Sequence, residues 1–123
     1  MQTQLHLVSR ALESANLVDM VNGVDRNFAR LQACIGAYHT KFKVWPTYAV
    51  LDPLVLWDLA RLLDAPAFEQ LGGKIELRAR PEAFSIGIAV GGPRGVQCYE
   101  DVDLERVPDG EPEKVAQWLG ISV

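Results

Sequence analysis

The sequence predicts an α+β fold, in which helices cover one face of a small antiparallel sheet of three strands with a candidate fourth strand at its edge. Apolar residues recur every three to four positions in the first third of the 123-residue chain, which is typical of helices. Between Lys74 and Glu100 they alternate instead with polar or small residues, which is typical of half-buried strands. Short strand connections beside helices that share one core define a two-layer arrangement.

The length and composition fit one ordinary globular domain. A chain of 123 residues can bury one core, so we expect residues 1–123 to form a single domain. Hydrophobic residues make up 49% and charged residues 23% of the chain, so we do not expect long disordered segments. No apolar run is long enough to span a bilayer or to form a signal peptide, so we expect a cytoplasmic protein.

Near the start of the chain, apolar residues recur at spacings of three and four, which predicts a helix over residues 4–15. Its apolar face comprises Leu5, Val8, Leu12 and Ala15. Asn22-Gly23 then breaks the pattern. We take residues 1–22 as a candidate oligomerisation element appended to the domain.

The clearest helical pattern follows Asp25, which is a suitable N-cap. Its apolar residues step by three or four positions and fall on one stripe, which comprises Phe28, Leu31, Ile35, Tyr38 and Phe42. Pro46 prevents the helix from continuing, because proline lacks an N–H group and restricts the residue before it. This stripe must therefore pack on a sheet or on another helix.

The middle of the chain alternates between strand and helix signals. Residues 47–51 are rich in strand-forming types and give the candidate edge strand. Asp52-Pro53 supplies the preferred cap and first position of a new helix, whose apolar face continues through Leu63. Pro66 opens a further short helical turn, which we expect to end at Gly72-Gly73.

Three strands are expected in the second half of the chain. Residues 74–80 alternate strictly between apolar and charged types, and a similar alternation over 84–90 gives the next strand. The glycine-rich residues 91–95 then predict a hairpin loop, and 96–100 the returning strand. Pro112 opens a last helix, which ends at Gly120.

Four features occur in this order: Trp45-Pro46-Thr47 before a strand, the strand Lys74-Ile75-Glu76-Leu77, Tyr99 on a returning strand, and a terminal Trp118-Leu119-Gly120. With them, residues 36–121 resemble a group of small uncharacterised bacterial proteins. The N-terminal helix lies outside this resemblance. The resemblance implies no particular activity, cofactor or substrate.

The sequence contains no recognisable catalytic or metal-binding motif. Cys34 and Cys98 form no C-x-x-C pair, so neither a disulfide framework nor structural zinc is expected. His6 and His39 are the chain's two histidines, and they belong to no metal-binding or nucleophile motif. The loop at 91–95 precedes a strand rather than a helix, unlike phosphate-binding loops. We therefore expect no enzyme, no metal and no cofactor.

Acidic residues concentrate near the C-terminus. Residues 100–114 contain seven acidic and two basic residues, while the whole chain has a net charge of −4. Such a segment is either a solvated surface or a docking surface for a basic partner. We select Asp101, Asp103 and Glu105 as candidate partner-binding residues. The overall charge makes a protein partner a better expectation than nucleic acid.

Aromatic residues supply two further candidate sites. Trp57 and Trp118 lie at the borders of apolar helix faces, where large aromatics either close a core or anchor an interface. We include both among the candidate partner-binding residues. A pocket between sheet and helices is the alternative site, and its candidate lining residues are Tyr38, His39, Trp45 and Tyr99.

These observations predict a noncatalytic protein-interaction or accessory module, acting as a homodimer or with another protein. One such role would be to inhibit a nucleic-acid-handling complex. A small-molecule-binding protein or weak enzyme that uses the pocket is the first alternative. The second alternative is RNA binding by a sheet face that carries Lys74, Arg78 and Arg80, with Tyr99 and Phe84 as the available aromatics.

Overall fold

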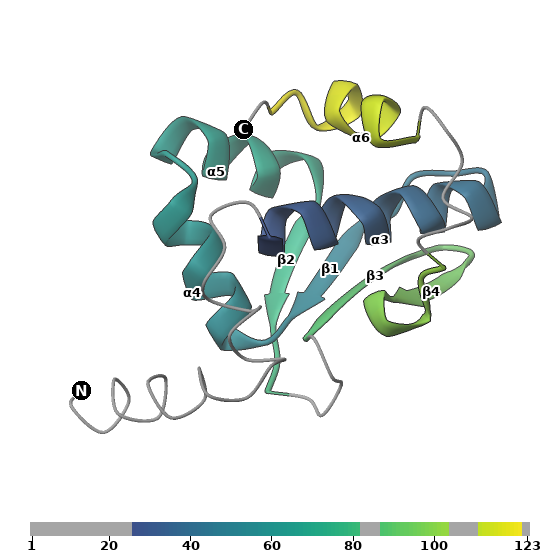
Figure 1. Cartoon of the computed structure of the whole chain (residues 1–123), viewed down its shortest axis with the longest axis horizontal. Coiled ribbons are helices and arrows are strands. Elements are labelled where there is room, and N and C mark those ends of the chain that lie inside the picture. Colours follow the sequence, from purple (N-terminus) through teal and green to yellow (C-terminus); the bar gives the residue numbers. More distant parts are fainter. Residues whose placement is uncertain (1–25, 82–86, 104–110, 122–123) are drawn as a thin grey trace.

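The computed structural model describes residues 26–81, 87–103 and 111–121. This part of the chain contains a four-stranded sheet and four α-helices (Figure 1). The helices are α3 (Arg26–Phe42), α4 (Pro53–Leu62), α5 (Ala65–Lys74) and α6 (Glu111–Leu119). The strands are β1 (Tyr48–Leu51), β2 (Glu76–Ala79), β3 (Ile88–Gly92) and β4 (Gly95–Cys98), and a short 3₁₀ helix, η1 (Tyr99–Asp101), follows β4. The predicted α+β class is confirmed. The predicted helix over 4–15, Phe84 and Glu105 lie outside the described residues.

The sheet is mixed, with the order β2-β1-β3-β4. β1 pairs in parallel with β2 and antiparallel with β3, and β3 pairs antiparallel with β4. The prediction of a wholly antiparallel sheet with residues 47–51 at its edge was therefore wrong. The connection through α4 and α5 carries the chain back to the end at which β1 began, so β2 runs parallel to β1. β1 is central, and β2, with its charged residues, lies at the edge.

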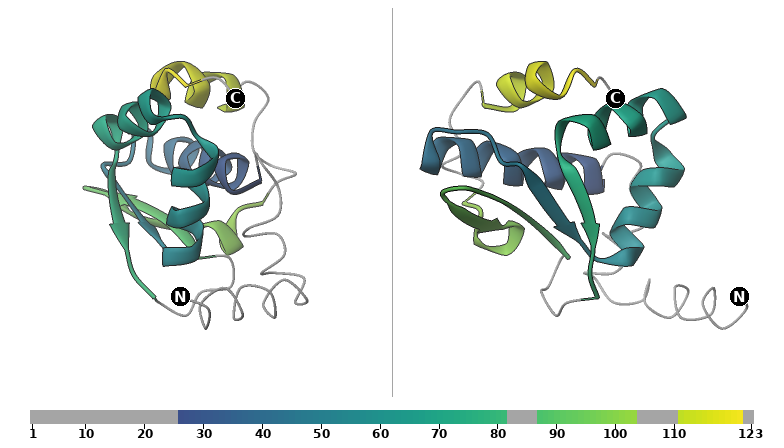
Figure 2. Two further views of the ribbon diagram at one scale, coloured as in Figure 1. Left: turned by 90° about the vertical axis from the view of Figure 1, so that its left-hand side faces the viewer. Right: turned by 180° about the vertical axis from the view of Figure 1, so that it is seen from behind.

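Helices cover one face of this sheet. The left view of Figure 2 shows the strands on one side of the molecule and α3 and α4 on the other. α3 packs on β3 and β4 of the sheet and also on α6, and its predicted apolar stripe is buried from Phe28 to Tyr38. Phe42 packs on the edge of the same core. Ile88 and Val90 of β3 supply the sheet side of this contact, as the alternation predicted.

Local capping residues set the ends of α4 and α5. The Asp52 carboxylate accepts a hydrogen bond from the Leu54 N–H at 2.9 Å, and Pro53 occupies the first turn of α4. Asp64 caps α5 in the same way, through the Ala67 N–H at 2.8 Å. α5 runs through Gly72-Gly73 to Lys74, so the expected stop at the two glycines was wrong. Neither glycine has the positive φ that ends a helix in a left-handed turn.

The predicted hairpin between β3 and β4 is confirmed. Gly92 pairs with Gly95, and Pro93 and Arg94 form the turn. Gly95 has φ of 154°, and a Cβ atom at this position would lie 2.7 Å from the Phe42 ring. Beneath the turn, the buried Tyr38 hydroxyl accepts a hydrogen bond from the Arg94 N–H at 3.4 Å. The hairpin glycines thus allow the turn to lie directly on the end of α3.

Candidate functional site

Helix α4 presents a distinct outer surface, which we call the α4 face and define by Pro53, Trp57, Ala60 and Arg61. All four residues are exposed, and they recur at helical spacing, whereas Val55, Asp58 and Leu59 are buried on the opposite side. Trp57 and Val96 are the large apolar side chains that remain exposed within the described residues. Trp57 is 48% exposed, so the α4 face offers a broad apolar surface to solvent.

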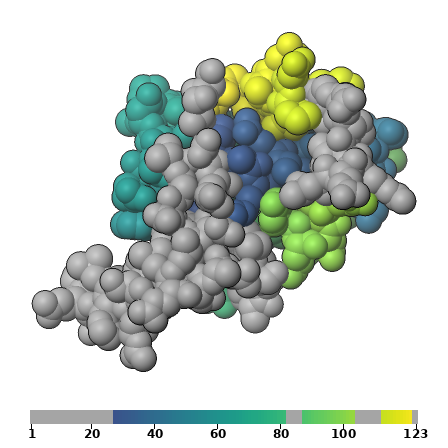
Figure 3. All heavy atoms as spheres, in the orientation of Figure 1, coloured from purple at the N-terminus to yellow at the C-terminus, as the bar shows by residue number. Residues whose placement is uncertain are grey.

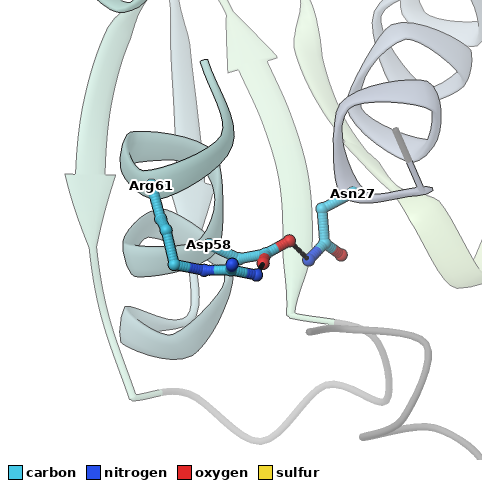
Figure 4. Close-up of polar contacts among 3 residues, drawn as sticks. All are labelled: Asn27, Asp58 and Arg61. Atoms are coloured by element: carbon cyan, nitrogen blue, oxygen red, sulfur yellow. Dashed lines mark hydrogen bonds and ion pairs between the residues drawn. The ribbon is translucent and has the colours of Figure 1, made fainter. Parts of the chain in front are cut away.

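A buried carboxylate lies directly behind this face (Figure 4). Asp58 is fully buried, and its Oδ2 accepts a hydrogen bond from Asn27 Nδ2 at 2.7 Å. Its Oδ1 accepts a second hydrogen bond from Arg61 Nη2 at 2.9 Å, which is also an ion pair. Asn27 is fully buried as well and comes from the first turn of α3. The two bonds therefore tie α4 to α3 and fix the Arg61 side chain from beneath.

Arg61 in turn contacts the exposed tryptophan. Its guanidinium carbon lies 5.0 Å from the centre of the Trp57 ring, within the range of a cation–π contact. The side chain of Arg61 remains 47% exposed. The α4 face thus combines a broad aromatic surface with an arginine whose position the buried Asp58 determines. Tryptophan and arginine are the residue types most enriched among the energetic centres of protein interfaces.

Sequence reasoning selected Trp57 but missed Asn27, Asp58 and Arg61. A signal for Asp58 is present in the sequence, because this acid stands between Val55 and Leu59 on the apolar face of its helix. A buried acid of this kind requires polar partners. Arg61, one turn later, is a suitable ion-pair partner, whereas only the tertiary structure identifies Asn27 as the partner on α3.

The second predicted interface tryptophan, Trp118, lies in a stack of side chains. Trp118 and Trp45 stack with ring centres 4.7 Å apart and an angle of 5° between the rings. His39 stacks on Trp45 at 3.8 Å, and Lys74 Nζ lies 5.6 Å from the centre of the Trp118 ring. This aromatic stack joins the end of α3 to α5 and α6. Trp118 therefore contributes to closing the fold, and its role in partner binding stays a prediction.

The structure brings together only part of the predicted pocket lining. His39 and Trp45 are in contact, but Trp45 is packed between His39 and Trp118. Tyr38 is fully buried beneath the hairpin, and Tyr99 packs against the core at the start of η1. Side chains of the chain itself thus occupy both faces of the Trp45 ring. A pocket that uses these four residues stays a prediction.

The predicted acidic residues lie away from the α4 face. Asp101 and Asp103 are exposed at and just after η1, beside the β4 edge of the sheet. Figure 3 shows α4 in teal and the β4 region in green on opposite sides of α3. The tertiary structure therefore separates Trp57 from the acidic pair. Two separate surfaces result.

The predicted basic sheet face is also divided. Lys74 is the last residue of α5. The prediction that its side chain projects from a strand was therefore wrong. Arg78 lies over the Tyr48 ring, with 4.0 Å between the guanidinium carbon and the ring centre, and is ion-paired with Glu76. Arg80 is exposed just after β2. RNA binding by these residues stays a prediction.

No group of three or more histidine, cysteine, aspartate or glutamate residues within residues 26–81, 87–103 and 111–121 could hold a metal ion. No helix in the same ranges has both the length and the apolar character needed to cross a bilayer.

The two cysteines differ in reactivity. Cys34 is buried, its thiol donates a hydrogen bond to the Gln97 carbonyl at 3.1 Å, and burial raises its pKa strongly. Burial also raises the pKa of Cys98, and the negative charges of Asp101 and Glu100 add to this effect. A raised pKa means less of the reactive thiolate at any pH below it.

We therefore expect Asp101→Asn to lower the pKa of Cys98 and to increase its alkylation rate. The increase at mildly alkaline pH should be roughly two- to threefold, because removing one exposed charge has a modest effect that salt screens. The rate is measured with iodoacetamide and mass spectrometry. Cys34 serves as the internal control, since it should react only after unfolding. A rate that Asp101→Asn leaves unchanged at low salt would show that burial alone controls Cys98.

Comparison of the sequence and structure with protein-family models, with curated proteins and with solved structures found no match.

Proposed function

We propose that this protein is a noncatalytic interaction module of the bacterial cytoplasm, which binds a protein partner through the α4 face. The observation that carries the proposal is the placement of Trp57, which is 48% exposed yet in contact with an arginine held from beneath. An exposed tryptophan costs solvation free energy in the isolated protein, and a partner that covers it recovers this free energy.

The contacts around Arg61 support this role. Binding usually orders long side chains at an entropic cost, and a residue that is already fixed avoids part of it. Arg61 is already bound to the buried Asp58 and lies against Trp57, so less side-chain freedom is left to lose on binding. Ala60 is small and allows a partner's backbone or side chains to approach Trp57 closely.

The acidic residues suit a second contact with a partner that has a basic surface. Asp101 and Asp103 are exposed at and just after η1, which follows the edge strand β4. Exposed charges contribute more to the rate and selectivity of association than to its affinity. A basic subunit of a nucleic-acid-handling complex is one partner of this kind. A second copy of the chain, which would form a homodimer, is the other candidate for the α4 face.

The proposal predicts that Trp57→Ser and Ala60→Glu each weaken partner binding strongly without unfolding the protein. The test compares quantitative capture from host lysate by the tagged protein and its variants, together with light scattering of each purified protein. Loss of the central aromatic of an interface typically costs 2 kcal/mol or more, which corresponds to a roughly thirtyfold loss of affinity.

The matched control is Ala65→Glu, which places the same charge at an exposed alanine of the neighbouring helix α5. It should bind like the original protein. Wild-type material of twice the monomer mass, with Ala60→Glu monomeric, would identify the partner as a second copy. Capture that neither α4 variant changes would refute a role for the α4 face.

A further inference from the structure

The sheet ends at β2 in a strand edge that no other described segment covers. The Glu76 N–H and the Arg80 N–H both donate hydrogen bonds toward β1, to the carbonyls of Thr47 and Leu51. Because strand residues alternate, Leu77 and Ala79 direct their N–H and C=O groups away from β1. No turn or loop among the described residues bonds to these groups. The left view of Figure 2 faces this edge and shows no described helix covering it.

The side chains of β2 also leave this edge accessible. Glu76 and Ala79 are exposed, and 40% of the Arg78 side chain is in contact with solvent. Leu77 packs against the core from the helix side of the sheet. A row of unpaired backbone groups is a template for another strand, and proteins usually protect such an edge with charged side chains. The pattern of charge on β2 therefore determines what can pair with it.

The charges of β2 suit a second copy of the same strand. Glu76 and Arg78 lie on one face of the strand, and Leu77 lies between them on the other. In an antiparallel pair whose two-fold axis passes through Leu77, Glu76 of each copy lies opposite Arg78 of the other. An axis through Arg78 or through Ala79 would place arginines opposite one another. Of these registers, only the one through Leu77 pairs each charge of the strand with its opposite.

The same register fits the backbone. The N–H and C=O groups of Leu77 point outward, so the two Leu77 residues form a hydrogen-bonded pair at the axis. Ala79 lies opposite Ile75, whose C=O group points in the same direction as that of Leu77. On the helix side, the two half-buried Leu77 side chains meet. The other edge strand, β4, contains no charged residue that could select a register in this way.

We propose that two copies of the chain pair through β2, in antiparallel orientation about Leu77, so that their sheets join into one. A pair of short strands covers much less than the roughly 800 Å² that a stable dimer takes from each copy. The dimer is therefore reversible, and its population depends on protein concentration. The pairing needs no residue of the α4 face, so a dimer carries two such faces. A partner with two matching sites then binds more tightly than either face alone would allow.

The test reverses the charges of β2 in the full-length protein. Glu76→Arg alone places like charges opposite each other in both cross-strand pairs, and Arg78→Glu alone does the same with the opposite sign. Each variant should weaken the dimer about tenfold or more at low salt. An equimolar mixture of the two variants should restore the dimer, because each mixed pair again joins opposite charges. Sedimentation equilibrium over a range of concentrations measures the dissociation constant.

Two control variants separate this contact from other causes of association. Glu113→Arg makes the same change of net charge at an exposed site of α6 and should dimerise like the original protein. Ala60→Glu, on the α4 face, should also dimerise normally. Ala79→Pro provides a test that is independent of charge. It removes an outward N–H group that the sheet of one copy does not use, so it should weaken the dimer without unfolding the monomer.

Three results would overturn the proposal. The first is an original protein that stays monomeric at every concentration. The second is a mixture of the two charge variants that stays monomeric although circular dichroism shows that both are folded. The third is a dimer that Ala60→Glu abolishes and the β2 variants leave intact, which would assign the association to the α4 face and support the proposed function alone.

Discussion

Trp118→Ala is expected to lower the free energy of unfolding by about 3 kcal/mol, at the low end of the range for removing a large aromatic because Trp118 is only partly buried. The change removes the contact with Trp45 and the cation contact with Lys74. α6 then keeps its hold on the core mainly through Val115 and Leu119. Urea unfolding measures the loss, and the near-ultraviolet circular dichroism of the stacked tryptophans should weaken with it.

The matched control for Trp118 is Trp57, a tryptophan on the α4 face. Trp57→Ala removes the same side chain from an exposed site and should cost less than about 1 kcal/mol. Trp118→Phe keeps an aromatic ring against Trp45 and should recover part of the loss. Equal destabilisation by Trp57→Ala and Trp118→Ala would show that the aromatic stack does not hold α6.

Asp58→Ala is expected to lower the free energy of unfolding by about 2 to 3 kcal/mol. The change leaves the Asn27 amide buried without the acceptor of its 2.7 Å hydrogen bond. A buried donor without a partner costs the full free energy of its desolvation. The loss lies below the usual range for breaking a buried ion pair, because the Arg61 side chain is 47% exposed and regains water. Urea unfolding of the variant measures it.

Two comparisons identify the source of this loss. Asp64→Ala also removes a carboxylate that accepts a hydrogen bond, but from an exposed helix cap, and should be less destabilising. Combining Asn27→Ala with Asp58→Ala should destabilise the protein by less than the sum of the single changes. Each single change leaves the other polar group buried without its hydrogen-bond partner, and the double change removes both groups. Strict additivity would show that the two buried groups do not depend on each other.

Asp58→Ala also tests the candidate site. Without the carboxylate, Arg61 loses the contact that fixes it from beneath, while Trp57 remains on the surface. Partner binding should therefore weaken even at temperatures where the variant is fully folded. Binding that stays at the original affinity would show that Trp57 acts without a fixed arginine.

The described helices were predictable because their signals are local. The stripe from Phe28 to Phe42 repeats at the spacing of a helix, and the Asp52-Pro53 pair starts the next helix by itself. The hairpin at Gly92 to Gly95 was equally clear, since glycine is required where the chain turns against Phe42. Each of these features depends on residues within a few positions of one another.

The order of the strands was not predictable in the same way. The sequence places the segment at 74–80 next to the segment at 84–90, but in the structure β1 lies between β2 and β3. This pairing depends on contacts between residues far apart in the chain and on the path through α4 and α5. The wholly apolar sequence of β1 was a signal for a central strand. The prediction paired strands that follow one another along the chain, and this placed β1 at the edge of the sheet.

By itself the sequence determined the α+β class, the main helices and the hairpin. Only the tertiary structure decided that Trp118 stacks on Trp45 and that Asp58 is buried between Asn27 and Arg61. The physical reason is the range of the interactions. Periodicity and capping act within one or two helical turns, whereas burial and the pairing of buried polar groups are set by distant segments once the chain has folded.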